Sequence, residues 1–333
     1  MAGYARKIII GLLSAGLLWY VLKDVAFAEL SQQFRRARYG WLLLVGLSML
    51  LTYGLRALRW RLLLQSAGHH PPVFRATVAI LAGTLAGLAF PGAGELTRCE
   101  TLRRTDRVPL ALSLGSVVAE RVVDLLMLGA LVGLTLLLEF ARLWTYFADT
   151  VGERLLRFWY VLPLTALLLA GGWQLLRRLL RPSPPPAAQP SRVQNAVRGL
   201  NEGLRTVRQL RQPGLFWGLS ALGYGLAFLT TYAAFLTSPL LRSLTPLAAL
   251  TVLALTSLGG LAVPTQGGVG TYHALASVGL RFYGFSLTDS VTAATFLHAI
   301  IVGTALLFSL GGFLLAPVLA LRHKASHISV TDA

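Results

Sequence analysis

The fold is decided by residues 74–124, which read FRATVAILAGTLAGLAFPGAGELTRCETLRRTDRVPLALSLGSVVAERVVD. The apolar run that begins this stretch stops at Pro91, before it reaches the ~20 residues that a helix needs to cross a bilayer. A small, flexible loop follows, and several charged residues come directly after it. A helix that ends inside the membrane and then returns explains this order. We therefore predict a re-entrant helical hairpin here.

Charged residues also open the next apolar segment, where Glu120, Arg121 and Asp124 precede an apolar run that is too short to cross a bilayer alone. Placing one charge at mid-bilayer costs about 2.5–3.5 kcal/mol. Glu120 and Asp124 share a helical face, and Arg121 is spaced to pair with Asp124. The spacing leaves two roles open: the charges neutralise one another to hold the fold, or they line a cavity.

The composition indicates a membrane protein with many spans. The chain has 333 residues, is 55% hydrophobic and has a mean hydropathy of +0.65. Its net charge of +17 comes from basic residues in short loops between apolar runs. Anionic lipid headgroups and the positive-inside rule explain that pattern better than nucleic acid does. Cys99 is the single cysteine, so an intramolecular disulfide and a multi-cysteine metal site are both excluded.

We expect an all-α polytopic membrane protein with about six full transmembrane helices and two re-entrant hairpins. The expected spans are residues 8–22, 41–64, 110–140, 158–176, 215–236 and 289–319. The first span is expected to be retained as a helix. The basic tail that begins at Arg322 indicates a cytoplasmic C-terminus, and an even number of spans then places the N-terminus there too. The expected location is a prokaryotic-type inner membrane.

The chain contains an internal duplication. AGLAFPGAG (86–94) and GGLAVPTQGG (259–268) each end an apolar segment at a proline and continue into glycines. Each is followed by a span with an ionisable residue, Glu120 in one and His298 in the other. Six crossings with an internal N-terminus place the first re-entrant element on the cytoplasmic side and the second on the outer side, so we predict an inverted repeat. Paired broken helices in halves of opposite orientation indicate a transport site near the bilayer midplane.

A single transmembrane domain over 1–333 is expected, with a first half at 1–140 and a second half at 155–333. The interval 177–213 contains a proline-rich linker that cannot continue a helix. It then has basic residues around a helical apolar stripe at 192–211, which is typical of a helix lying on an anionic membrane surface. We place this interval in the cytoplasm.

The candidate residues fall into two groups. The expected substrate-binding residues are Arg56, Arg59, Arg98, Arg121, Glu95, Glu120, Asp124, His273 and His298. The expected gating residues of the hairpins are Pro91, Gly94, Pro264, Gly267, Gly268, Gly270 and Thr271. Guanidinium groups suit phosphate, but Arg56 and Arg59 also fit the basic end of a helix that reaches for the interface. The second glycine cluster also fits a plain turn, and His298 also fits a hydrogen-bonded core histidine.

Nucleotide-binding, zinc-protease and hydrolase motifs are absent from the sequence, so we expect neither an enzyme, nor a cofactor, nor a metal site.

Four motifs together carry a resemblance to a known family. They are Arg56-x-x-Arg59-Trp60, Pro91-x-x-Gly94-Glu95-x-x-Arg98, Glu120-Arg121-x-x-Asp124 and Pro264-x-x-Gly267-Gly268-x-Gly270-Thr271. In this order they resemble the lysylphosphatidylglycerol synthase transmembrane, or flippase-like, family. The resemblance implies two facing re-entrant hairpins and movement of lipids between leaflets. In this chain Tyr272 and His273 stand where relatives often have a glutamate.

Three functions stay open at this point. The first is a lipid translocase for an anionic or zwitterionic phospholipid, or a polyprenyl-linked one. The second is a non-catalytic membrane partner of a separately encoded lipid synthase. The third is a lipid-modifying membrane enzyme that uses Glu120, Asp124 or a histidine as base. A lipid synthase and a second copy of the chain are the protein partners that the sequence allows, and nucleic acid is not expected as a partner.

Overall fold

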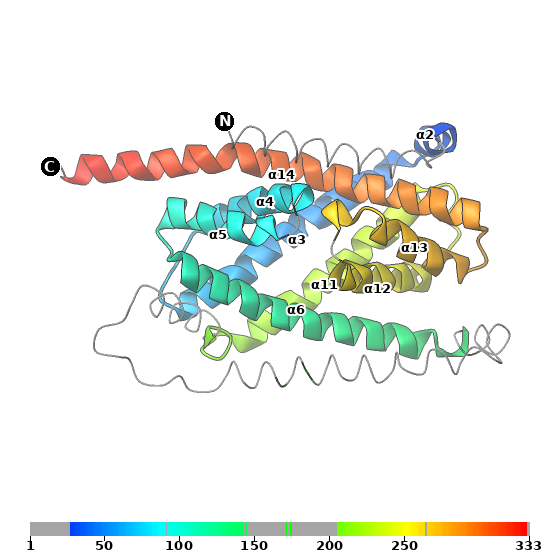
Figure 1. The fold of residues 1–333 in the computed structure, drawn as a ribbon, viewed down its shortest axis with the longest axis horizontal. Helices are drawn as coiled ribbons and strands as arrows, with labels where there is room; N and C mark the ends of the chain where they lie inside the picture. The colour runs from blue at the N-terminus through cyan, green and yellow to red at the C-terminus, as the bar shows by residue number, and fades with distance from the viewer. Residues whose placement is uncertain are drawn as a thin grey trace, which may run out of the picture.

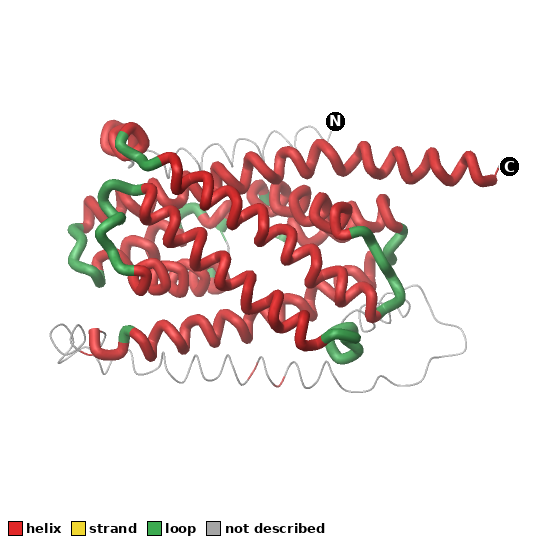
Figure 2. Tube along the Cα trace, turned by 180° about the vertical axis from the view of Figure 1, so that it is seen from behind, coloured by secondary structure: helices red, strands yellow, loops and turns green. Residues whose placement is uncertain are grey.

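The computed structural model describes residues 27–90, 92–142, 144, 171, 174, 205–263 and 265–331. Every regular element in these ranges is helical, and the connections between the long helices and their neighbours lie towards the two ends of the bundle (Figures 1 and 2). The elements are α2 (Phe27–Arg35), α3 (Tyr39–Ser66), α4 (Val73–Ala89), α5 (Ala93–Asp106), α6 (Leu110–Leu138), α11 (Pro213–Thr237), α12 (Pro246–Ala262), η1 (Gln266–Gly268), α13 (Thr271–Arg281) and α14 (Leu287–Thr331).

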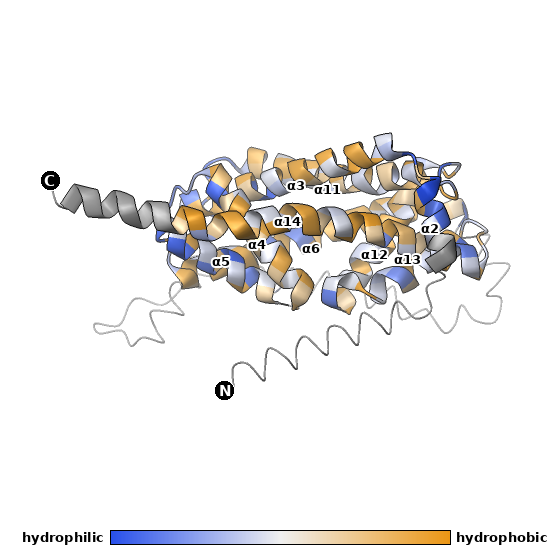
Figure 3. Cartoon of the chain, turned by 90° about the horizontal axis from the view of Figure 1, so that it is seen from above, coloured by the Kyte–Doolittle hydropathy of each residue, from blue (hydrophilic) through white to orange (hydrophobic). Residues whose placement is uncertain are grey.

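Four helices are long and apolar enough to cross a membrane: α3, α6, α11 and residues 287–320 of α14. Large apolar side chains on them, including Leu47, Leu137 and Leu307, face outward and are exposed. Figure 3 shows the same apolar colouring along these helices, with hydrophilic residues gathered towards the ends. An apolar exterior of this kind suits a lipid environment. Four of the expected spans are therefore present, and the other two, 8–22 and 158–176, lie outside the described residues.

Between the long helices lie two helical hairpins. The first is α4 with α5, and the second is α12 with α13. The longer arm of each has 17 residues, which gives a length of about 25 Å, less than the ~30 Å of a bilayer core. Pro91 and Pro264 lie outside the described residues, and the arms before them end at Ala89 and Ala262.

Glycine is required where each hairpin turns. Gly92 has a φ of 78° and precedes α5 directly. In the second hairpin Gly267, Gly268 and Gly270 have φ values of 58°, 79° and 84°. These lie in the left-handed region, where a side chain is strained and glycine is not.

The two halves run in opposite directions. The backbone N–H of Arg38, at the start of α3, donates to the carbonyl of Thr237, at the end of α11, over 3.1 Å. Nearer the middle, the hydroxyls of Ser48 and Thr230 lie 2.8 Å apart. The helices α3 and α11 are thus antiparallel. Because one hairpin follows the end of each, the two hairpins open towards opposite ends of the bundle (Figure 1).

The two halves also interlock. The long helix after each hairpin packs on the hairpin of the other half, so that α14 lies on α4 and α6 lies on α12. Gly312 of α14 is in close contact with Leu81 of α4, and Leu128 of α6 belongs to a buried cluster with Leu250 of α12. This exchange holds both hairpin tips in the middle of the molecule. Most of the 177–213 interval lies outside the described residues.

Candidate functional site

A buried carboxylate lies at the centre of the first half. The Glu120 side chain on α6 is 0% exposed. Arg59 of α3 donates from Nη2 to its Oε1 over 2.7 Å, and Arg98 of α5 donates from Nη2 to its Oε2 over 2.8 Å. One carboxylate therefore joins a long helix to the first hairpin through two charge-assisted hydrogen bonds.

The ion network continues one helical turn further along α6. Arg59 Nη2 also donates to Asp124 Oδ1 over 2.6 Å. Arg121 pairs with Asp124 over 3.6 Å, as the spacing predicts, and with Glu95 of α5 over 3.3 Å. The Arg121 side chain is 48% exposed, so the network runs from the buried Glu120 to an accessible edge. Arg59 is buried in this network and does not reach out from the helix end.

Aromatic rings support the two buried guanidinium groups. Arg98 lies over the ring of Trp60 at 5.0 Å, and Arg59 lies over the ring of Phe216 at 5.9 Å. The Trp60 indole N–H donates to Ser116 Oγ over 2.9 Å, which fixes the ring. The Nε and Nη1 atoms of Arg98 and the Nε atom of Arg59 are buried and have no hydrogen-bond partner among the described residues. These donors are available to bind oxygen atoms.

A pocket of about 210 Å³ adjoins the network. Its walls include Arg56, Arg121 and Asp124 from the first half, and Ser220 and Tyr224 from the second. Arg56 is half-buried, and within the described residues no carboxylate forms an ion pair with it. The four arginines of this region face three carboxylates, so the site has an excess positive charge beside a pocket.

The contribution of α11 was not predicted from the sequence. Arg59 Nη1 donates to Ser220 Oγ over 3.4 Å, and the Tyr224 hydroxyl donates to the backbone oxygen of Asp124 over 2.9 Å. Phe216, Ser220 and Tyr224 recur every four residues in an otherwise apolar helix. That spacing places them on one face, and it is the signal that could have identified them.

The second cluster surrounds the loop of the second hairpin. His298 of α14 lies 2.9 Å from the carbonyl oxygen of Gly267 through Nε2, and since a carbonyl can only accept, Nε2 carries the proton. The rings of His273 and His298 lie 4.6 Å apart, and Tyr272 packs 5.0 Å from His298. The Thr271 hydroxyl donates to the Val263 carbonyl over 3.2 Å, which ties the two arms together.

The loop of the second hairpin lies against the first hairpin. The helix η1 contacts α4, and a Cβ atom added to Gly267 would lie 3.6 Å from Leu88 Cδ2 in the last turn of α4. The two hairpin tips therefore meet, although they come from opposite ends of the bundle.

We predict that His298→Ala loosens this loop. Loss of a hydrogen bond of about 1 kcal/mol should raise amide exchange of residues 265–270 by roughly fivefold. Hydrogen exchange followed by mass spectrometry measures this. His70→Ala, at an exposed histidine, is the control and should leave the loop unchanged. Equal exchange in both variants would show that His298 does not hold the loop.

The predicted residues thus fall in two places. Arg59, Arg98, Arg121, Glu95, Glu120 and Asp124 form one network with Arg56 beside it, and His273 and His298 lie with Gly267, Gly268, Gly270 and Thr271. Gly94 lies where α4 and α5 touch. Among the described residues, no three His, Cys, Asp or Glu side chains gather closely enough to hold a metal ion.

Four apolar spans, paired helical hairpins and a buried ion network define a polytopic helical membrane protein with a polar centre. A family model described as the lysylphosphatidylglycerol synthase TM region matches residues 7–310, and the chain belongs to this family. The match covers both hairpins and both clusters. Comparisons with curated proteins and with solved structures find no match.

Proposed function

We propose that this protein is a lipid translocase, which moves a phospholipid or polyprenyl-linked headgroup between leaflets while the tails stay in the bilayer. The observation that carries the proposal is the network around Glu120, a set of buried arginines beside a pocket between the two halves. Buried ionisable residues in membrane helices usually line a route for polar matter. Guanidinium groups bind phosphate with paired hydrogen bonds.

In this proposal both hairpins are re-entrant, and they enter from opposite faces of the membrane. Their short arms and the antiparallel arrangement of α3 and α11 support this. With spans at 8–22 and 158–176, the bundle has six crossings and forms an inverted repeat. The first hairpin opens to the cytoplasm, with both termini on that side of a prokaryotic-type inner membrane.

The hairpin tips act as gates. They meet near Leu88 and Gly267, and the network reaches the first hairpin through Arg98. A headgroup phosphate that engages Arg56 and Arg121 in the pocket competes with the carboxylates for guanidinium donors. The protein supplies binding and orientation, and no chemical step is required, so we propose a transporter and not an enzyme.

The test is leaflet exchange in vesicles. Purified protein in vesicles of phosphatidylglycerol and phosphatidylcholine should accelerate the exchange of fluorescent phospholipids, measured as the fraction that an external quencher bleaches over time. Vesicles without protein and vesicles with heat-denatured protein are the controls. Equal rates with and without protein would overturn the proposal.

We predict that Arg56→Gln slows this exchange about tenfold, since it removes one charge-assisted contact with phosphate worth about 1.5 kcal/mol. Arg56→Lys keeps the charge but loses the planar guanidinium group, so its exchange rate should lie between those of the wild type and Arg56→Gln. Arg56 has no ion pair among the described residues, so the thermal midpoint should change little. An unchanged exchange rate in Arg56→Gln would exclude this residue from phosphate binding.

The family description supports a second candidate, a membrane partner of a lipid synthase, because it names the TM region of a synthase. Co-purification of a soluble synthase with the protein, together with no leaflet exchange by the protein alone, would favour this function over the first.

A further inference from the structure

The helix α5 has two functional faces. Glu95 and Arg98 point towards α6 and the central network. On the other side, Leu96, Glu100 and Arg104 line a separate groove against the C-terminal part of α14. The groove has a volume of about 980 Å³, at the upper end of the ~300–1,000 Å³ typical of small-molecule sites. The central site does not use it.

One end of this groove is basic. Arg104 and Arg107 both line it and are exposed. Glu100 is shared, because Arg103 and Arg104 both donate to it over 2.6 Å. These hydrogen bonds, above all that from Arg103, hold the pKa of the Glu100 carboxyl at about 2, so it stays charged at neutral pH. The charged residues that line the groove are thus one carboxylate, Glu100, and two arginines, Arg104 and Arg107, which leaves the groove with a net positive charge.

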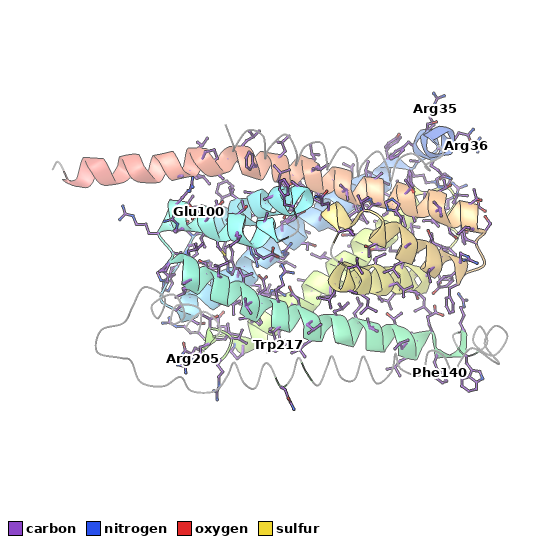
Figure 4. The ribbon with its side chains drawn as sticks, in the orientation of Figure 1. Arg35, Arg36, Glu100, Phe140, Arg205 and Trp217 are labelled. Atoms are coloured by element: carbon purple, nitrogen blue, oxygen red, sulfur yellow. The ribbon has the colours of Figure 1, made fainter. Side chains whose placement is uncertain are left out.

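Arg107 is the residue that caps the C-terminus of α5. Its φ is 55°, and among the described residues Arg107 alone has a positive φ without being a glycine. A non-glycine residue in the left-handed region costs roughly 1 kcal/mol. Within the described chain, no carboxylate forms an ion pair with it. Figure 4 shows Glu100 on α5 at the end of the molecule opposite Arg35 and Arg36.

The other end of the groove is apolar. Leu96 and Phe313 line it and are 56% and 50% exposed, and Ala82 and Ala316 complete its wall. Arg104 lies two helical turns from Leu96 along α5, which places the basic and apolar ends about 12 Å apart. The groove thus passes from charged to apolar along the direction of the long helices, as a bilayer does from headgroup to tail.

We propose that this groove holds a phospholipid with an anionic headgroup, taken from the leaflet at this end of the bundle. The phosphate binds Arg104 and Arg107, and an acyl chain lies between α5 and α14 against Leu96 and Phe313. The site is distinct from the central pocket and lies across α5 from it. A soluble anion would use the arginines alone, whereas a lipid also covers the exposed apolar wall.

The test uses phosphatidylglycerol with a photoreactive diazirine in one acyl chain, added to the full chain in nanodiscs of phosphatidylcholine. After illumination, labelled peptides are identified by mass spectrometry. Phosphatidylglycerol should label α5 and the 309–320 part of α14 more strongly than a phosphatidylcholine probe does. The double variant Arg104→Gln/Arg107→Gln should reduce this labelling roughly thirtyfold, since each arginine near a membrane surface contributes about 1 kcal/mol. Arg242→Gln, an exposed arginine at the opposite end, should retain it.

A second variant tests the apolar wall. Ala316→Trp places a large side chain in the groove between α5 and α14, and it should reduce labelling although both arginines remain. Elution as a monodisperse peak guards against misfolding in each variant. Wild-type labelling in both variants would overturn the proposal, and so would full competition by soluble glycerol phosphate, which would identify a site for free anions. This experiment measures lipid binding and not transport, so its result tests the groove independently of the translocase function.

Discussion

Glu120→Gln should be among the most damaging single substitutions in the protein. It leaves Arg59 and Arg98, with side chains only 7% and 3% exposed, without their shared carboxylate. Removing one partner of a buried ion pair costs about 3–5 kcal/mol, because the remaining charge stays buried. We expect a large fall in the thermal midpoint of unfolding, measured by tryptophan fluorescence in lipid nanodiscs. We also expect loss of leaflet exchange.

Glu100→Gln is the matched control. Glu100 also accepts hydrogen bonds from two arginines, but those arginine side chains are 53% and 68% exposed. Exposed ion pairs contribute about 0–1 kcal/mol, so this variant should keep most of its thermal midpoint. The same chemical change at two sites thus isolates burial as the cause. Similar midpoints for the two variants would contradict the assignment of Glu120 as the centre of the network.

A second variant separates stability from function. Glu120→Gln/Arg98→Met removes one of the two buried cations together with the carboxylate, and should recover part of the lost stability. It should not recover leaflet exchange, because the buried ion pair between Glu120 of α6 and Arg98 of the first hairpin is still absent. Recovery of both would mean that the network has a structural role alone.

Two local features of this candidate site could be predicted from the sequence. The short apolar run before Pro91 indicated a broken helix, and the spacing of Arg121 and Asp124 indicated their pair. Both signals involve residues that are close in the sequence. The regular geometry of a helix fixes how such residues lie relative to one another, so their contacts can be predicted. The inverted repeat was predicted from the duplication together with a count of six spans, and the antiparallel α3 and α11 agree with it.

Contacts between distant helices were not predictable in the same way. The partner of Arg59 is 61 residues away at Glu120, and Ser220 is 161 residues away. Ser48, Thr52 and Arg59 mark a polar face of α3, but its sequence does not say which other helix that face meets, since this depends on how distant helices pack together. For the same reason the groove between α5 and α14 has no local signal.

Gly83→Ala should force apart the two closely packed arms of the first hairpin. A Cβ atom at Gly83 would lie 2.6 Å from the carbonyl oxygen of Gly94 and 3.0 Å from Arg98 Cβ. The first of these atoms is backbone and cannot move aside, so α4 and α5 must separate. Overpacking of this kind costs about 1–3 kcal/mol. Separation also carries Arg98 away from Glu120, so leaflet exchange should fall together with the thermal midpoint.

Gly133→Ala makes the same change on α6, where an added Cβ atom meets no atom of the described residues within 4 Å. Replacing glycine in an open helical position stabilises by up to about 1 kcal/mol, since alanine is the better helix former. The two variants should therefore shift the thermal midpoint in opposite directions. Gly94→Ala, whose Cβ atom would lie 2.8 Å from the Gly83 carbonyl oxygen, should repeat the loss from the other arm. If both hairpin variants match Gly133→Ala in midpoint and exchange rate, then α4 and α5 are not packed through these glycines, and Arg98 is not held against Glu120 by this contact.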